Sequence, residues 1–146
     1  MNRMAREILF KAKRIDNGEW VKGYLVKCRT SEEEGYAIKD TVYHVNDGII
    51  NLIPCVVEES TICQYTGLKD RNGRKIFEND VVFVTDDEGR SGQVDTGVGE
   101  IDFLEGLWYI SGNVQNSLYD INKCFLIEVI GNIFDNPELL GGADNG

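Results

Sequence analysis

The chain has 146 residues, of which 42% are hydrophobic and 27% charged, with 16 glycines and only 2 prolines. A chain of this size buries a substantial core without disulfides or metals, and its composition argues against disorder of the whole chain. The net charge of −10 argues against general binding to the nucleic-acid backbone, which requires clustered Lys and Arg.

The charge is unevenly spread along the sequence. Residues 1–27 carry seven basic and three acidic side chains, a net charge of +4, whereas residues 78–105 carry nine acidic side chains and one basic, a net charge of −8. The simpler interpretation of the second segment is a solvated acidic face. The alternative is that the basic N-terminal segment of one subunit meets the acidic middle segment of another.

Residues 1–16 lack the continuous apolar run of a signal peptide, and no stretch approaches the roughly 18 apolar residues of a membrane span. We therefore expect a cytoplasmic protein that contacts no membrane. Reduced thiols are expected there. The chain has four cysteines, none of them in a CxxC pair, and one histidine: Cys28, Cys55, Cys63, Cys124 and His44. We therefore expect neither a metal nor a cofactor.

Strand-forming residues dominate the first part of the chain. We expect strands at 7–13 and 19–27, joined by an Asp-Asn-Gly turn, and a short strand at 36–38. Residues 41–45 and 49–53 predict a second hairpin of the same kind, which Pro54 ends because proline lacks the donor that a strand requires.

The middle of the chain holds the densest sequence signal. After one helical turn at 58–61, we expect a strand at 62–66 that Gly67 ends, and then a charged surface turn at 69–74. The chain re-enters the core at Ile76 and Phe77, and residues 81–85 (VVFVT) make the strongest strand prediction.

The segment 86–97 is rich in glycine and acidic residues and predicts a loop. Residues 98–103 and 107–111 predict a third hairpin, and 118–121 and 126–134 predict the last strands. Pro137 closes the final strand and begins one helical turn, 137–140, before a frayed tail, 141–146.

The sequence shows no sustained helical periodicity and no internal repeat. It therefore predicts a mainly β protein of about ten short antiparallel strands with little helix, arranged as a partly open barrel so that strand edges are covered. We expect one unit, residues 1–146, with a possible N-terminal lobe (1–58) and C-terminal lobe (59–140) that share a core.

Sequence motifs of common enzymes are missing: the chain has no P-loop, no GxSxG, no GxGxxG after a strand and no HExxH. The acidic cluster Asp86-Asp87-Glu88, with Asp102, has the carboxylates that a metal-dependent nuclease needs, but it lacks the spaced ligands of a calcium loop. A solvated loop is the favoured interpretation.

Three segments carry a family resemblance: REILFKAKRIDNGEWVKGY (6–24), QYTGLKDRNGRKIFENDVV (64–82) and EVIGNIFDNPELL (128–140). In these segments the chain resembles the YopX family of bacteriophage and prophage proteins. The resemblance implies a β-rich protein with an SH3-like roll and a phage or prophage origin, and it implies no activity. The family usually has Gly where this chain has Asn79; Asn tolerates a positive φ, so we expect left-handed backbone there.

Two sets of residues follow as candidates. The first is a structural motif drawn from the family-like segments: Gln64, Tyr65, Thr66, Gly67, Asn79, Asp80, Gly131, Asn132, Asn136 and Pro137. The second is a candidate interaction surface of acidic residues: Asp86, Asp87, Glu88, Asp95, Glu100 and Asp102.

The functional hypothesis is a non-enzymatic phage or prophage accessory protein that acts through protein–protein contacts, with itself as a homo-oligomer or with a host or phage protein. Two alternatives stay open: an acidic inhibitor of a host nucleic-acid-binding protein, and a small β-barrel that binds nucleic acid. The last rests on fold analogy alone.

Overall fold

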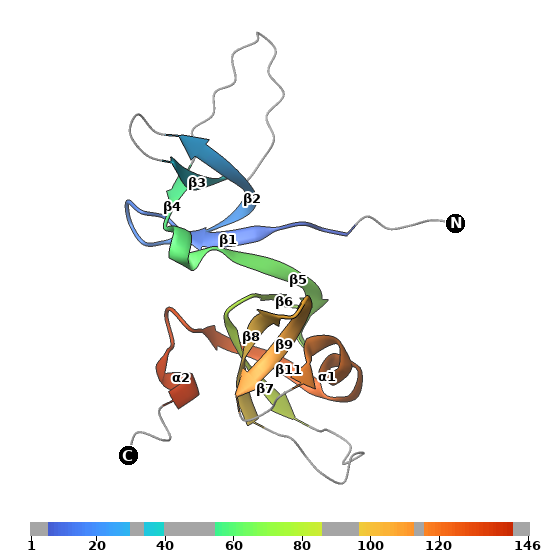
Figure 1. Cartoon of the computed structure of the whole chain (residues 1–146). Coiled ribbons are helices and arrows are strands. Elements are labelled where there is room, and N and C mark those ends of the chain that lie inside the picture. Colours follow the sequence, from blue (N-terminus) through green and yellow to red (C-terminus); the bar gives the residue numbers. More distant parts are fainter. Residues whose placement is uncertain (1–5, 30–33, 40–54, 86–96, 113–115, 142–146) are drawn as a thin grey trace, which may run out of the picture. The chain divides into compact units, whose positions relative to one another are not determined.

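The computed structural model describes residues 6–29, 34–39, 55–85, 97–112 and 116–141 (Figure 1). The chain divides into two compact units, residues 1–65 and 66–146. Strands form two antiparallel sheets, and helix in the described residues is limited to short segments. The prediction of a mainly β protein with little helix is confirmed, whereas the SH3-like roll stays a prediction.

The first unit consists of antiparallel strands in the spatial order β4-β3-β2-β1-β5. Strands β1 to β4 form a meander, and β5 pairs with β1 on the side away from β2. Its elements are β1 (Phe10–Lys13), β2 (Trp20–Arg29), β3 (Glu34–Lys39), β4 (Cys55–Val57), the 3₁₀ turn η1 (Glu59–Thr61) and the first part of β5 (Cys63–Lys69). Ala12, Ile38 and Val57 form its buried core. The predicted turn between β1 and β2 is present, with Gly18 at a φ of 74°.

The second unit contains a five-stranded antiparallel sheet in the order β10-β9-β8-β7-β11 (Figure 1). The strands of this sheet are β7 (Asp80–Thr85), β8 (Gly97–Leu104), β9 (Leu107–Gly112), β10 (Asn116–Ser117) and β11 (Leu126–Asn132). The unit also contains β6 (Lys75–Phe77), which pairs with β5, and the helices α1 (Leu118–Cys124) and α2 (Glu138–Gly141). The order is linear, so the described strands do not close into a barrel.

One face of this sheet forms the core of the second unit. Because side chains alternate along a strand, every second residue of β7, β8, β9 and β11 points to this face. The buried residues there are Val82, Val84, Ile101, Ile110, Ile127 and Val129. Leu118 and Ile121 of α1 pack against them, so α1 covers this face of the sheet.

The prediction of a strand at 118–121 is wrong, because these residues begin helix α1. Ser117 caps the helix: its hydroxyl accepts a hydrogen bond from the Asp120 N–H at 3.2 Å and donates one to the Asp120 carboxylate at 2.7 Å. Leu118 and Ile121 lie almost one helical turn apart and are both buried. The pattern of a Ser followed three residues later by an acid was therefore the signal for this helix.

The prediction that Gly67 ends a strand is also wrong. Strand β5 continues to Lys69, and Gly67 lies within it at a φ of 88°. Glycine takes that conformation without a steric penalty, so the strand changes direction there without ending. The predicted hairpin at 41–53, the loop 86–96 and the tail beyond Gly141 lie outside the described residues.

In the part of the chain that the structure describes, no helix combines the length and the apolar character that crossing a membrane requires. Cys63 is buried, and its thiol donates a hydrogen bond to the Thr61 carbonyl at 3.2 Å. The side chains of the other three cysteines lie outside the described residues.

Candidate functional site

The first four residues of the structural motif lie along β5, where their backbone and side-chain hydrogen bonds fix the strand to its neighbours. Gln64 pairs with Phe10 of β1, and the N–H of the buried Tyr65 donates to the Leu9 carbonyl at 2.8 Å. In the second unit, the Thr66 hydroxyl donates to the Ile76 carbonyl at 2.8 Å and accepts from the Leu68 N–H at 3.2 Å. The hydroxyl therefore joins the backbone just after Gly67 to that of β6.

Asn79 and Asp80 shape the entry into β7. Asn79 has a φ of 69°, which confirms the predicted left-handed backbone. Its N–H donates to the Ile101 carbonyl at 2.8 Å, and its carbonyl accepts from the Ile133 N–H at 3.0 Å. The buried Asp80 carboxylate accepts from the Phe77 N–H at 2.8 Å, so it closes the turn that leads into the strand.

Gly131, Asn132, Asn136 and Pro137 form the turn after β11. The Asn132 side-chain oxygen accepts from the N–H groups of Phe134 and Asp135 at 3.0 and 2.9 Å. The Asn136 N–H donates to the Asn132 carbonyl at 2.8 Å. The Asn136 amide occupies the space that a Cβ on Gly131 would need, so glycine is required for this packing. The helical turn predicted at 137–140 is present one residue later, as α2 (Glu138–Gly141), so Pro137 precedes the helix and Gly141 belongs to it.

A further structural residue, Asp70, was missed in the sequence. This buried carboxylate accepts hydrogen bonds from the N–H groups of Asn72 and Arg74, both at 2.9 Å, and from the N–H of Val129 in β11 at 2.9 Å. In addition, the Arg71 N–H donates to the Ile127 carbonyl at 2.9 Å. The turn at 70–74 therefore covers the outer edge of the five-stranded sheet, which protects it from pairing with other chains.

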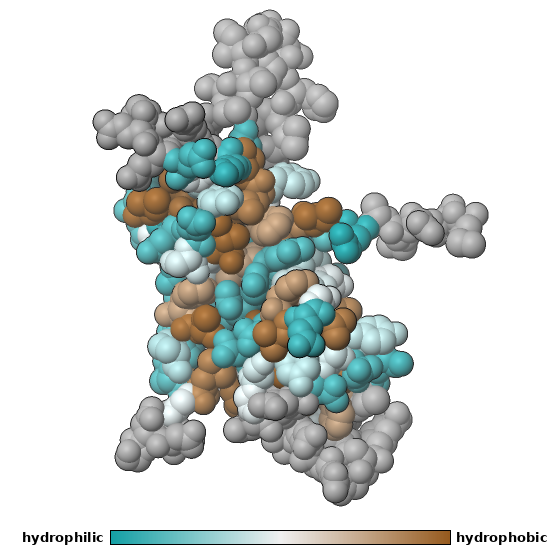
Figure 2. Space-filling model, in the orientation of Figure 1, coloured by the Kyte–Doolittle hydropathy of each residue, from teal (hydrophilic) through white to brown (hydrophobic). Residues whose placement is uncertain are grey.

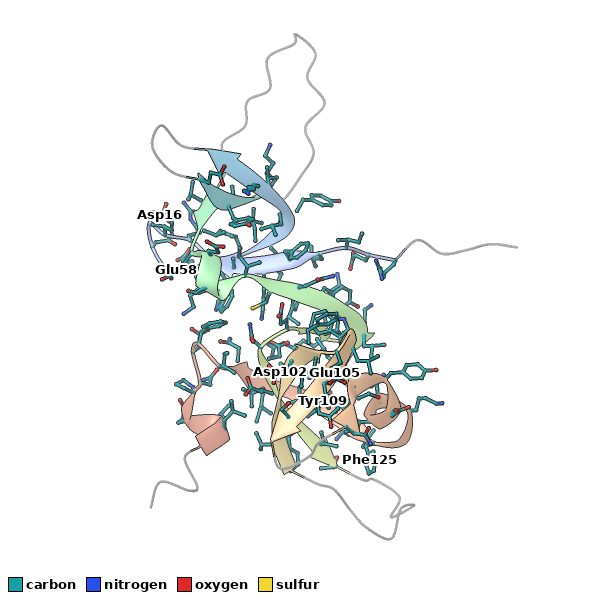
Figure 3. All side chains as sticks on the ribbon, viewed as in Figure 1. Asp16, Glu58, Asp102, Glu105, Tyr109 and Phe125 are labelled. Carbon is teal, nitrogen blue, oxygen red and sulfur yellow. The ribbon has the colours of Figure 1, made fainter. Side chains whose placement is uncertain are left out.

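The remaining candidates, Glu100 and Asp102, lie on the face of the five-stranded sheet opposite α1. We call this surface the acidic sheet face. The pairing register places the following residues on it: Val81, Phe83 and Thr85 of β7, Val98, Glu100, Asp102 and Leu104 of β8, Leu107, Tyr109 and Ser111 of β9, and Leu126 and Glu128 of β11. Figure 3 labels Asp102 and Tyr109, which are cross-strand partners on it.

The acidic sheet face combines carboxylates with exposed apolar side chains. Phe83, Leu104 and Leu107 are 40%, 46% and 57% exposed, whereas Val81, the cross-strand partner of Glu100, is fully buried. Helix α2 also contacts β8, so the most exposed part of the face is the end at Leu104 and Leu107. None of the strand positions described on this face carries a Lys or Arg, although Glu100, Asp102 and Glu128 bring three negative charges. In Figure 2, apolar residues (brown) are likewise interspersed with polar ones (teal) over the visible surface of the second unit.

The electrostatics of this face are unfavourable for Glu100. Burial, together with the neighbouring negative charge of Asp102, raises the pKa of the Glu100 carboxyl above its ordinary value of 4.5. A carboxylate that is partly desolvated beside a like charge costs folding free energy at neutral pH. Such a cost is typical of residues kept for a function, although a raised pKa also occurs in purely structural positions.

The turn between β8 and β9 is a tight two-residue turn. Glu105 and Gly106 both have positive φ, 51° and 82°, the combination that a two-residue type I′ hairpin requires. At the base of this turn the Phe103 and Trp108 rings meet edge to face with centroids 4.9 Å apart, and Trp108 also packs against the core. Phe103 is nevertheless 53% exposed, so the hairpin tip presents apolar side chains on both faces.

The acids of the predicted loop, Asp86, Asp87, Glu88 and Asp95, lie outside the described residues. Within the described residues, no group of three or more His, Cys, Asp or Glu side chains is arranged to hold a metal ion. The exposed leucines beside the acids were missed in the sequence. Their signal was the pair Phe103-Leu104 followed, across Glu-Gly, by Leu107-Trp108 in a surface hairpin.

Comparisons with known proteins agree with the segments that carried the resemblance. The chain is similar to protein EF1440 from Enterococcus faecalis, whose crystal structure matches with a TM-score of 0.52 and 23% sequence identity, over 93% of this chain and 99% of that one. This likeness shows a shared fold. No curated protein matches the sequence. The family model described as YopX protein matches residues 3–141, nearly the whole length, and the chain therefore belongs to the YopX family.

Proposed function

We propose that this protein is a non-enzymatic accessory protein of a phage or prophage that acts through protein–protein contacts. The observation that carries the proposal is the acidic sheet face, where Leu104 and Leu107 are exposed beside Glu100 and Asp102. Adjacent exposed apolar side chains on a rigid sheet are typical of protein interaction surfaces. The phage or prophage origin is what the family resemblance implies.

Self-association is the first form of contact that we propose. The basic segment 1–27 and the acidic segment 78–105 carry charges of opposite sign, so the basic segment of one copy attracts the acidic segment of another in a head-to-tail arrangement, against the overall repulsion of two chains of net charge −10. Sedimentation velocity at low and at high salt tests this. We expect an oligomer at low salt that dissociates as salt screens the attraction; a monomer at high protein concentration and low salt would contradict self-association.

Inhibition of a host nucleic-acid-binding protein is the second candidate, because the acidic sheet face presents carboxylates without a cation at its described strand positions. Such a face resembles a nucleic-acid backbone in its charge and attracts basic surfaces. The test is a competition assay, in which this protein should displace DNA from a basic DNA-binding protein of the host. The idea fails if the double variant Glu100→Gln, Asp102→Asn displaces DNA equally well.

Direct binding of nucleic acid is the alternative that these observations favour least. A filter-binding assay at about 50 mM salt, where phosphate contacts are strongest, separates it from the proposal. We expect no retention of single-stranded or double-stranded DNA. Retention that weakens steeply with added salt would instead support a nucleic-acid-binding module.

A further inference from the structure

The acidic sheet face has a regular spacing that defines what fits it. Glu100, Asp102 and Leu104 follow each other on one face of β8, and alternate residues of a strand lie about 6.7 Å apart. The neighbouring strand β9 adds Tyr109 beside Asp102, and Leu107 beside Leu104. Val98 precedes Glu100 on this face and has Phe83 as its cross-strand partner, so the two carboxylates lie between apolar side chains. From Glu100 onward the face changes from acidic to apolar along the strand, with a step equal to the side-chain repeat of an extended chain.

The apolar end of the face is preorganised. Leu104 and Leu107 are cross-strand partners at the end of a hairpin whose turn requires positive φ at both central residues, and the Phe103–Trp108 contact supports the hairpin from its other side. A partner that covers these two leucines therefore orders little of this protein, which lowers the entropic cost of binding.

We propose that the acidic sheet face binds an extended segment of a partner protein in which two basic residues, at alternate positions, are followed by apolar residues. The basic side chains pair with Glu100 and Asp102, and the apolar side chains cover Leu104 and Leu107. Charge complementarity selects this partner, because Glu128 adds a further carboxylate and none of the described strand positions of the face contributes a cation. The inference rests on the proposed function and specifies its partner.

The two parts of the face have different tasks in this arrangement. Burial of the leucines by apolar side chains supplies most of the affinity, because removal of apolar surface from water is the main favourable contribution to association. The carboxylates supply orientation and specificity, since their pairing with cations depends on the direction of the bound segment. Bound cations also remove the repulsion between Glu100 and Asp102, so binding should lower the raised pKa of Glu100.

The test titrates the full-length, ¹⁵N-labelled protein with short synthetic peptides and follows the amide signals by NMR. The probe peptide has Lys, Lys, Leu and Leu at alternate positions with Ser between them. One control peptide replaces Lys by Glu, and another replaces Leu by Ser. We expect the probe to shift signals of β8 and β9 with weak affinity, about 0.1 to 1 mM, and both controls to bind at least about tenfold more weakly.

Variants then locate the site. The double variant Leu104→Ser, Leu107→Ser removes exposed side chains, so it should fold and should lose the probe's binding by about tenfold or more. Tyr119→Ser is the matched control, because Tyr119 is 62% exposed on α1 and lies away from the acidic sheet face. Glu100→Gln with Asp102→Asn should weaken the probe and abolish its preference over the Glu-containing peptide.

Several results would overturn the inference. Equal binding of the probe and either control peptide would show non-specific attraction, and binding unchanged by Leu104→Ser, Leu107→Ser would place the peptide elsewhere. If no peptide binds and the same leucine variant abolishes self-association in sedimentation, a second copy of the chain covers this face. In that last case the proposed function stands and only this inference fails. A monomer that also binds none of the peptides contradicts this inference and the self-association form of the proposed function.

Discussion

The carboxylate of Asp70 and the backbone N–H of Val129 are joined by a hydrogen bond of 2.9 Å, although 59 positions separate them in the sequence. The other oxygen of the carboxylate closes the turn at 70–74 by accepting from two further backbone N–H groups. One buried side chain thus fixes a local turn and attaches it to an edge strand. The stability of the second unit should depend on it.

Asp70→Asn should destabilise the protein by about 1 to 3 kcal/mol, because an amide has one acceptor oxygen where the carboxylate uses two. Urea denaturation followed by fluorescence measures the change. Asp16→Asn is the control, since Asp16 is exposed and pairs with Arg14 at the surface, where such a pair contributes little. A change no larger than that of the control would contradict the structural role of Asp70.

The contribution of Asp70 should depend on pH in a defined direction. Burial raises the pKa of this carboxyl, but hydrogen bonds from the N–H groups of Val129, Arg74 and Asn72 outweigh it and hold the pKa below its ordinary value of 3.8. A carboxyl whose pKa is lower in the folded state stabilises the fold at any pH above its unfolded-state pKa. This stabilisation is lost as the pH falls through the folded-state pKa. The stability difference between the protein and Asp70→Asn should be constant near neutral pH and should shrink below about pH 4.

Glu100→Gln should have the opposite effect at neutral pH. Burial and the charge of Asp102 raise the pKa of Glu100 in the folded protein, so ionisation of Glu100 opposes folding. The protonated carboxyl stabilises the fold at low pH, and this stabilisation is lost as the pH rises through the folded-state pKa. At pH 7 the variant should therefore be more stable than the unsubstituted protein by about 0.5 kcal/mol. This gain should disappear when the pH falls below the ordinary carboxyl pKa of 4.5. Thermal unfolding across this pH range, with Glu59→Gln as an exposed control, measures it.

Asn79 should tolerate Gly better than Ala. Both substitutions remove the Asn79 amide group, so the difference in unfolding free energy between the two variants measures the cost of a φ of 69° in a residue that has a Cβ. We expect this cost to be about 1 to 2 kcal/mol. Asn122 in α1 is the control position, because in a helix the order reverses and Ala is favoured over Gly. Equal stabilities of Asn79→Gly and Asn79→Ala in chemical denaturation would show that the backbone conformation is not what selects Asn79.

Local patterns predicted the elements whose signal lies within a few residues. The strand-forming residues of β7 and β11, the turn at Gly18 and the positive φ of Asn79 were all evident, because strand propensity and turn chemistry depend on neighbours in the chain. The short helix α1 was predicted as a strand. Its apolar pair, Leu118 and Ile121, is too brief for a helical period to stand out, and the Ser117 cap was overlooked.

The candidate site was predicted only in part. The acidic residues Glu100 and Asp102 were identified from charge, but the leucines that share their face were not, since the face of a residue depends on the strand register. Likewise Asp70 looked like one charge in a charged turn. Its burial follows from β11, which is distant in the sequence and close in space.

The family, the β-rich fold class and the chemistry of the turns were evident from the sequence, because strand propensity, glycine placement and motif spacing are properties of short segments. The tertiary structure decided which side chains share a surface. Strand pairing brought Asp102 beside Tyr109 and Leu104 beside Leu107, and it brought Asp70 to the edge of β11. Such relations join distant segments through the packing of the core and the register of the sheet, which no local pattern specifies.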